Sequence, residues 1–111
     1  MSNDKKYFPL AYVRVYAFMA ERARELGYAL TIHGSLMRDC DMVAIPWTKE
    51  AVATDVFVRE MIDVSGGTLA PDDFHSAKPH GRLAWAICLA APYYIDLSVM
   101  PRTPVDPEPT F

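Results

Sequence analysis

The stretch YALTIHGSLMRDCDMVAIPW, residues 28–47, decides how this chain folds. Its first six residues are short, β-branched in part and alternating, which is typical of a strand with two different faces. A turn signal follows at Gly34 and Ser35, and residues 40–47 form a second apolar run, whose two apolar faces favour a central position in a sheet. Because too few residues separate the runs for a helical crossover, the stretch predicts an antiparallel hairpin.

A helix is predicted before this hairpin, over residues 9–26. Apolar or small side chains recur there on one stripe at helical spacing: Val13, Tyr16, Ala17, Ala20 and Ala23. Pro9 suits the first turn of a helix, and Gly27 suits the left-handed position that ends one.

A second helix is predicted directly after the hairpin. Thr48 has the character of an N-cap, and Glu50 places a negative charge in the first turn, where the helix dipole favours it. The helix is expected to run to about Ser65 and to stop at the Gly-Gly pair that follows. Residues 66–82 are rich in Gly, Pro, Asp and His, which predicts a loop.

Two further strands are predicted near the C-terminus, over residues 82–90 and 94–100. The first has large residues on one face and small residues on the other, and the second alternates in the same way. The fold class is therefore α+β, a two-layer sandwich in α-β-β-α-β-β order, with a four-stranded, mostly antiparallel sheet and two helices on its large-residue face. Residues 1–100 form a single domain, and residues 101–111 form a proline-rich tail that cannot continue a sheet.

Composition excludes several classes of protein. With 111 residues and 51% hydrophobic side chains, the chain has room for one domain with a real core. The net charge of −3 argues against broad binding to a nucleic-acid backbone. No signal peptide or membrane-spanning run is visible, which predicts a cytoplasmic protein. Cys40 and Cys88 are in no regular pair spacing, which favours reduced, buried thiols over a disulfide.

Three acidic residues are the main candidates for chemistry. Asp39 and Asp41 are two apart and share a face if the strand begins that early, and Asp96 lies between apolar residues in the last predicted strand. A buried carboxylate needs a partner or a metal ion. Three converging carboxylates suit Mg²⁺, so Asp39, Asp41 and Asp96 are predicted as metal ligands and catalytic residues.

Basic and turn residues around these acids are candidates for phosphate binding. Gly34 permits close backbone approach, and Ser35 has a hydroxyl and an amide for a phosphate oxygen. Arg38 lies beside the first acid. The segment KPHGR adds donors on alternate residues just before the third predicted strand: Lys78, His80 and Arg82.

A purely structural interpretation of the same residues is open. Asp39 caps the turn in that case, Asp41 pairs with Arg38 or Arg82, and Asp96 lies with Ser98 on an exposed sheet face. The KPHGR segment is then a solvated loop that makes weak surface pairs. Surface or packing roles are favoured for His33 and His75, and core positions rather than ligand stacking for the aromatic residues Trp47, Trp85, Tyr93 and Tyr94.

The arrangement of Gly34-Ser35, Asp39-x-Asp41 and a later Asp96 resembles the nucleotidyltransferase superfamily. The resemblance covers about residues 28–100. It implies a core in which the Gly-Ser turn holds a nucleoside triphosphate and the three acids bind divalent metal for nucleotidyl transfer. One feature departs from the pattern: only Leu36, Met37 and Arg38 separate Ser35 from Asp39, where the superfamily has room for about two helical turns.

The sequence is also similar to short proteins encoded by bacteriophages, which share its HGS-x-x-RD-x-D, IPW, K-x-HGR and IDLSVMPR segments. This similarity favours treating the acids and the KPHGR loop as one site, in the host cytoplasm. Three hypotheses follow: a metal-dependent nucleotidyltransferase-like protein, a catalytically inactive nucleotide-binding module, or a phage accessory protein. The last acts through a protein partner or a homodimer on the small-residue face of the third predicted strand.

Overall fold

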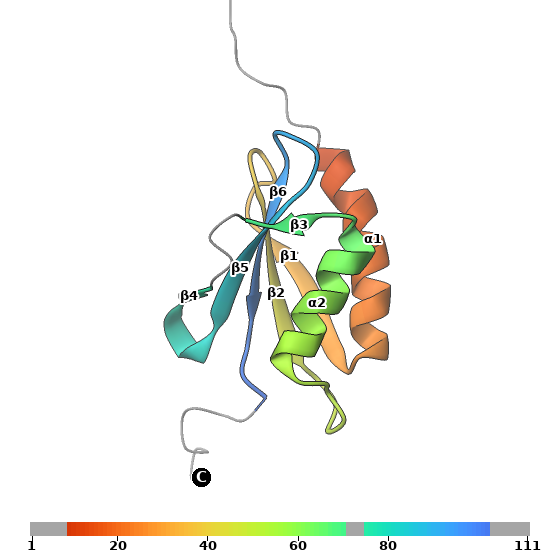
Figure 1. The fold of residues 1–111 in the computed structure, drawn as a ribbon, viewed down its shortest axis with the longest axis vertical. Helices are drawn as coiled ribbons and strands as arrows, with labels where there is room; N and C mark the ends of the chain where they lie inside the picture. The colour runs from red at the N-terminus through yellow and green to blue at the C-terminus, as the bar shows by residue number, and fades with distance from the viewer. Residues whose placement is uncertain (1–8, 71–74, 103–111) are drawn as a thin grey trace, which may run out of the picture.

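The computed structural model describes residues 9–70 and 75–102, which form two helices on a six-stranded mixed sheet (Figure 1). The helices are α1 (Pro9–Glu25) and α2 (Thr54–Ser65), and a short 3-10 turn, η1, spans Pro79–Gly81. The strands are β1 (Tyr28–His33), β2 (Cys40–Pro46), β3 (Thr68–Leu69), β4 (Ser76–Ala77), β5 (Leu83–Cys88) and β6 (Tyr94–Val99). Across the sheet the order is β1-β2-β6-β5-β3, and β4 also pairs with β5.

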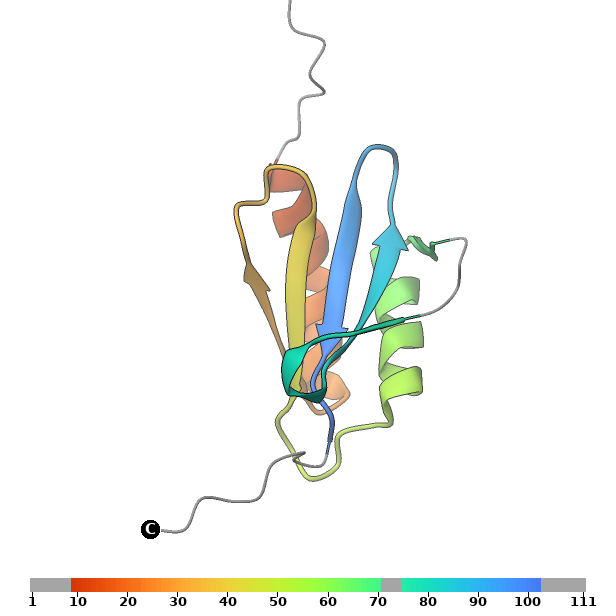
Figure 2. The same ribbon diagram turned by 90° about the vertical axis from the view of Figure 1, so that its left-hand side faces the viewer.

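The predicted hairpin is present, with β1 antiparallel to β2 and His33 opposite Asp41. The prediction of four strands was wrong, because β3 and β4 are additional strands of two residues each. The described sheet is mostly antiparallel, as predicted, and β2 and β6 form its parallel pair. The parallel pair arises because β6 inserts between β2 and its own hairpin partner β5. This insertion places the two strands that carry the predicted acids side by side (Figure 2).

The second helix begins five residues later than predicted: its N-cap is Ala53 rather than Thr48, and Glu50 lies before its first turn. The backbone amides of Trp47 and Thr48 instead donate to the Gly27 carbonyl at 2.8 and 3.2 Å. Gly27 has φ +90°, and a Cβ there would lie 2.6 Å from the Thr48 hydroxyl oxygen. These hydrogen bonds to Gly27 therefore hold Trp47 and Thr48 in a non-helical conformation after β2, and the helix begins beyond them.

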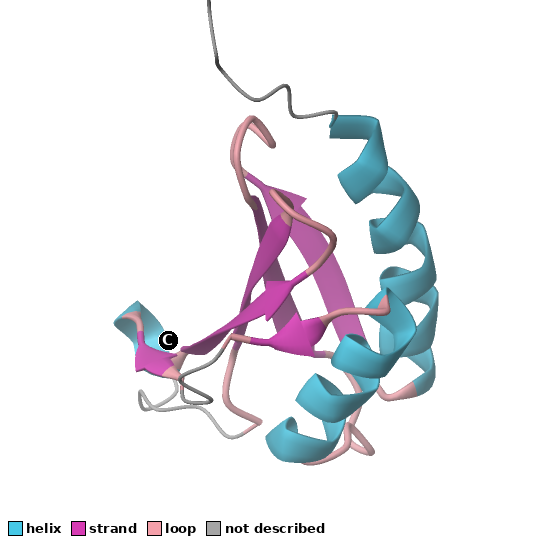
Figure 3. Ribbon diagram, turned by 45° about the horizontal axis from the view of Figure 1, so that its top comes forward, coloured by secondary structure: helices cyan, strands magenta, loops and turns pink. Residues whose placement is uncertain are grey.

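Both helices lie on one face of the sheet and leave the other face open (Figure 3). The largest side chains of the core that are buried between the layers are Tyr12, Met19, Tyr28, Met42, Phe57, Met61, Ile87, Ile95 and Leu97. The rings of Tyr28 and Phe57 stack with centroids 4.1 Å apart. The α+β class and the placement of the helices thus agree with the sequence prediction.

Other predictions concern the ends of the chain and the cysteines. The proline-rich tail, residues 101–111, falls mostly outside the described residues, which end at Arg102. Among the described residues no helix is long and apolar enough to cross a membrane. Cys40 is buried and Cys88 half-buried, and both are free thiols, as predicted.

Candidate metal and phosphate site

One row of side chains crosses the open face of the sheet at the candidate site. The strand register places His33 opposite Asp41, Asp41 beside Asp96, and Asp96 opposite Ala86. Residues paired in register point to the same face, and neighbouring strands are about 4.8 Å apart. The row therefore consists of a histidine, two acids and an alanine from four adjacent strands.

Asp39 joins this row from the turn before β2. One carboxylate oxygen each of Asp39, Asp41 and Asp96 lies within 4.8 Å of the others, and all three residues are half-buried. The spacing of two residues puts Asp39 on the side of Asp41, and the parallel pairing of β2 with β6 brings in Asp96. The structure thus brings together the three acids that the sequence singled out.

The acidic cluster has no basic partner at ion-pair distance. Within residues 9–70 and 75–102, the ion pairs with N···O up to 4.0 Å join Arg22 to Glu25, Arg22 to Glu60, and Arg59 to Asp55. The expected alternative, a pair between Asp41 and Arg38 or Arg82, is not among them. Among the described residues the basic side chains near the cluster, those of His33, Lys78 and Arg82, thus lie beyond ion-pair distance of its carboxylates.

The pKa of Asp41 is changed by its surroundings. Burial raises the pKa of the Asp41 carboxyl, and the charges of Asp39 and Asp96 raise it further, while His33 acts in the opposite direction. Burial, together with Asp41 and Asp39, also raises the pKa of the neighbouring Cys40 thiol to about 12. Cys40 therefore stays protonated at neutral pH, and the donors of the cluster are carboxylate oxygens alone.

Lys78 and Arg82 lie next to the acids. They line a hollow of about 210 Å³ together with His33, Asp41, Met42, Asp96 and Ser98. The Arg82 guanidinium donates to the Ser98 hydroxyl and to the Pro79 carbonyl, both at 3.1 Å. These two bonds hold the guanidinium over the open face, so an anion arriving there meets an ordered donor.

The other predicted phosphate ligands lie apart from this hollow. Ser35 is exposed, and its hydroxyl accepts a bond from the Met37 amide at 3.3 Å. Arg38 contributes its carbonyl to a 2.6 Å bond from the Tyr12 hydroxyl. His80 is exposed in η1 with φ 67°. None of these three side chains lines this hollow, and none lines the neighbouring hollow that contains Asp39 and Asp96.

The turn at Gly34 lies directly against Asp41. Gly34 has φ +89°, and a Cβ at this position would lie 3.1 Å from Oδ2 of Asp41. The backbone of the turn is therefore packed directly against the carboxylate, and no phosphate fits between Gly34 and Asp41. His33 and Ser98 are the site residues that sequence reasoning did not assign, although the two-residue strand period already put Ser98 on the face of Asp96.

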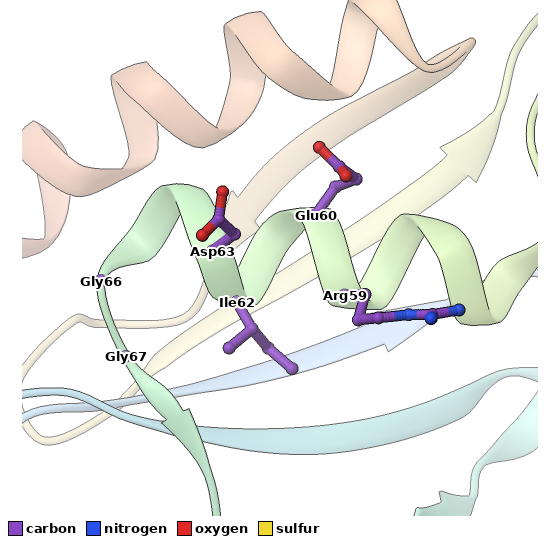
Figure 4. Close-up of a pocket in the computed structure, with 6 residues that line it drawn as sticks. All are labelled: Arg59, Glu60, Ile62, Asp63, Gly66 and Gly67. Atoms are coloured by element: carbon purple, nitrogen blue, oxygen red, sulfur yellow. The ribbon is translucent and has the colours of Figure 1, made fainter.

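A larger hollow of about 600 Å³ lies elsewhere, at the C-terminal end of α2 (Figure 4). The labelled side chains there point in different directions rather than toward one centre. Glu60 is bound to Arg22 at 2.7 Å, and Gly67 is small because a Cβ would lie 2.6 Å from the Cys88 carbonyl oxygen. This hollow is explained by packing of α2 and β3 and has no convergent chemistry.

The donor set of the acidic cluster fits a hard divalent cation. Mg²⁺ and Mn²⁺ prefer oxygen ligands, and Mg²⁺ commonly takes one or two carboxylates together with water and phosphate. No protein-family model matches this sequence, and no curated protein matches it either.

Proposed function

We propose that this protein binds a divalent cation through Asp39, Asp41 and Asp96, and a nucleotide through that cation and the side chains of Lys78 and Arg82. The observation that carries the proposal is the approach of three carboxylates within 4.8 Å. No basic group of the described residues lies within 4.0 Å of them. Carboxylates this close repel one another unless they take up a proton or a cation.

The basic residues support a phosphate rather than a bare metal as the physiological ligand. A site for a cation alone gains nothing from Lys78 and Arg82 at its edge, because both repel the ion. Phosphate groups that share the cation bring negative charge, which these donors match. The cation would neutralise and orient the phosphate oxygens, while Arg82, held by Ser98, would bind them with two N–H groups in fixed geometry.

Nucleotide binding without transfer is the second candidate, and one observation favours it. Gly34 packs against Asp41, which leaves no room for a triphosphate between the turn and this acid. Transfer of a nucleotidyl group remains the activity that the superfamily resemblance implies. Incubation with nucleoside triphosphates and Mg²⁺ distinguishes the candidates: transfer yields a product, whereas the binding module saturates and returns its ligand unchanged.

A titration with Mn²⁺ followed by amide NMR tests the proposal, because the paramagnetic ion broadens signals near its site. We expect low-micromolar Mn²⁺ to erase the signals around Asp39, Asp41 and Asp96 together. Asp96→Asn should weaken Mn²⁺ binding at least about tenfold, since it removes one charged ligand. Asp63→Asn is the matched control, because Asp63 is exposed on α2, away from the cluster. Broadening scattered over the surface would contradict the proposal.

A further inference from the structure

A second hollow adjoins the acidic cluster on the open face of the sheet. Its volume is about 290 Å³, and it is lined by Asp39, Ala70, His75, Ser76, Lys78, Ala84, Trp85, Ala86, Tyr94 and Asp96. Asp96 and Lys78 also line the hollow that contains Arg82 and Ser98. The two hollows are therefore neighbours that share two lining residues, Asp96 and Lys78.

The floor of this second hollow is made of small side chains. Ala86 is opposite Asp96 in the row that contains the metal ligands, and Ala84 is opposite Ser98 in the next row. Alanine at both positions leaves the sheet surface low, because a larger side chain on this face would fill the space one strand away from Asp96. A flat group can therefore lie close to the strand here.

One aromatic side chain borders this space on the open face, because Tyr94 shares the face of Asp96 in β6. Trp85 pairs in register with Leu97 and so belongs to the face that the helices cover, and its ring contacts that of His75 with centroids 5.3 Å apart. Tyr94 is 40% exposed, high for a large aromatic side chain. Polar atoms are also present, from Ser76 and from the shared Lys78 and Asp96. A low apolar floor, the side chain of Tyr94 at its border and a few hydrogen-bonding groups suit a planar heterocycle.

We propose that this second hollow is a base-binding subsite, in which the nucleobase of the bound nucleotide lies over Ala84 and Ala86. The inference rests on the proposed function, because it takes the phosphates to be held by the adjoining acids and basic residues. It extends that function by specifying the ligand class: a nucleoside phosphate with an aromatic base, rather than an inorganic polyphosphate or a sugar phosphate. The base contributes affinity of its own.

The continuity of the two hollows carries this assignment. A ligand with anionic phosphates at one end and a planar ring at the other matches the change from Arg82 and Asp41 to Ala86 along one sheet face. A polyphosphate, which is charged throughout, gains nothing from an apolar floor with an aromatic side chain at its border. A protein loop would need no acids at one end.

The test compares ATP, GTP, CTP and UTP with tripolyphosphate, each with saturating Mg²⁺ and the full chain, by calorimetry. At least one nucleotide should bind at least about tenfold more tightly than tripolyphosphate. Ala86→Leu should remove that advantage and leave tripolyphosphate and Mn²⁺ binding within about twofold. The same change at Ala90, exposed after β5 and outside the hollow, should have no effect.

A second measurement on the unmodified chain keeps the inference testable even if Ala86→Leu does not fold. The base's ring current should shift the methyl signals of Ala84 and Ala86 when a nucleotide binds, and tripolyphosphate should not shift them. Equal affinity for nucleotides and tripolyphosphate, with unmoved methyl signals, would overturn the base-binding subsite and leave the proposed metal and phosphate site intact. Loss of Mn²⁺ binding at the acids would overturn both.

Discussion

At the scale of the residue, Asp41 has opposite effects on folding and on binding. Its pKa is raised in the folded chain by burial and by Asp39 and Asp96, so the folded state takes up a proton at Asp41 more readily than the unfolded state does. A raised carboxyl pKa means that the folded state binds more protons than the unfolded state, and stability falls as pH rises through that pKa. The ionised Asp41 therefore costs stability at neutral pH, and a bound cation would offset this cost.

Asp41→Asn should accordingly stabilise the metal-free protein at pH 7. Two unit charges about 4 Å apart in water repel by about 1 kcal/mol, so we expect a gain of about 1 kcal/mol in the free energy of unfolding. The gain should shrink as the pH falls and wild-type Asp41 becomes protonated. Urea unfolding at several pH values with EDTA measures both effects. A destabilised Asp41→Asn variant at pH 7 would show that the cluster is not strained by its charge.

Gly34 and Gly66 allow the contact between the turn and Asp41 to be measured separately from backbone strain. Both glycines have positive φ, +89° and +74°, but a Cβ would meet Asp41 Oδ2 at 3.1 Å at Gly34 and nothing within 4 Å at Gly66. Alanine at either position should cost about 1–2 kcal/mol through the left-handed backbone. Only Gly34→Ala should also weaken Mn²⁺ binding, because it displaces a ligand. Equal Mn²⁺ affinities for the two variants would argue against Asp41 as a ligand.

At the scale of the element, the sequence predicted strands and the first helix well because each has a local signal. The alternation in residues 28–33 and the stop at Gly27 depend only on neighbouring residues, and β1 and α1 match them closely. The start of α2 could not be predicted in this way. Thr48 has a favourable N-cap side chain, but its amide is bound to the carbonyl of Gly27, a contact that exists only after β1 and β2 have paired.

In the candidate site, too, the local features could be predicted from the sequence and the non-local contacts could not. The two-residue period of a strand predicted that Asp39 and Asp41 share a side and that Asp96 and Ser98 share a face. Their meeting depends on the parallel pairing of β2 with β6, which is a non-local contact with no signal in either strand. The basic loop is similar: Lys78 and Arg82 reach the site, whereas His80 between them does not line it, because η1 turns the chain there.

At the scale of the whole molecule, metal binding should be visible as a change in global stability. Two of the three proposed ligands belong to the central strands β2 and β6, and Asp39 directly precedes β2, so the cation would bridge the middle of the sheet. A ligand that binds only the folded state stabilises it in proportion to the logarithm of its concentration. Asp39 and Asp41 stay neighbours in the unfolded chain, but Asp96 is separated from them, so the three-carboxylate site exists only in the folded state.

Mg²⁺ at about 100 times its dissociation constant should therefore raise the free energy of unfolding by about 2.7 kcal/mol. For a domain of this size that corresponds to an increase in Tm of about 10 °C. Asp96→Asn should respond much less, and the control Asp63→Asn should respond as the wild type does. NaCl at equal ionic strength measures the stabilisation from charge screening alone, which Mg²⁺ must exceed in the wild type if it binds a specific site. An equal response of wild type and Asp96→Asn would mean that Asp96 is no ligand and that the open face of the sheet serves another purpose.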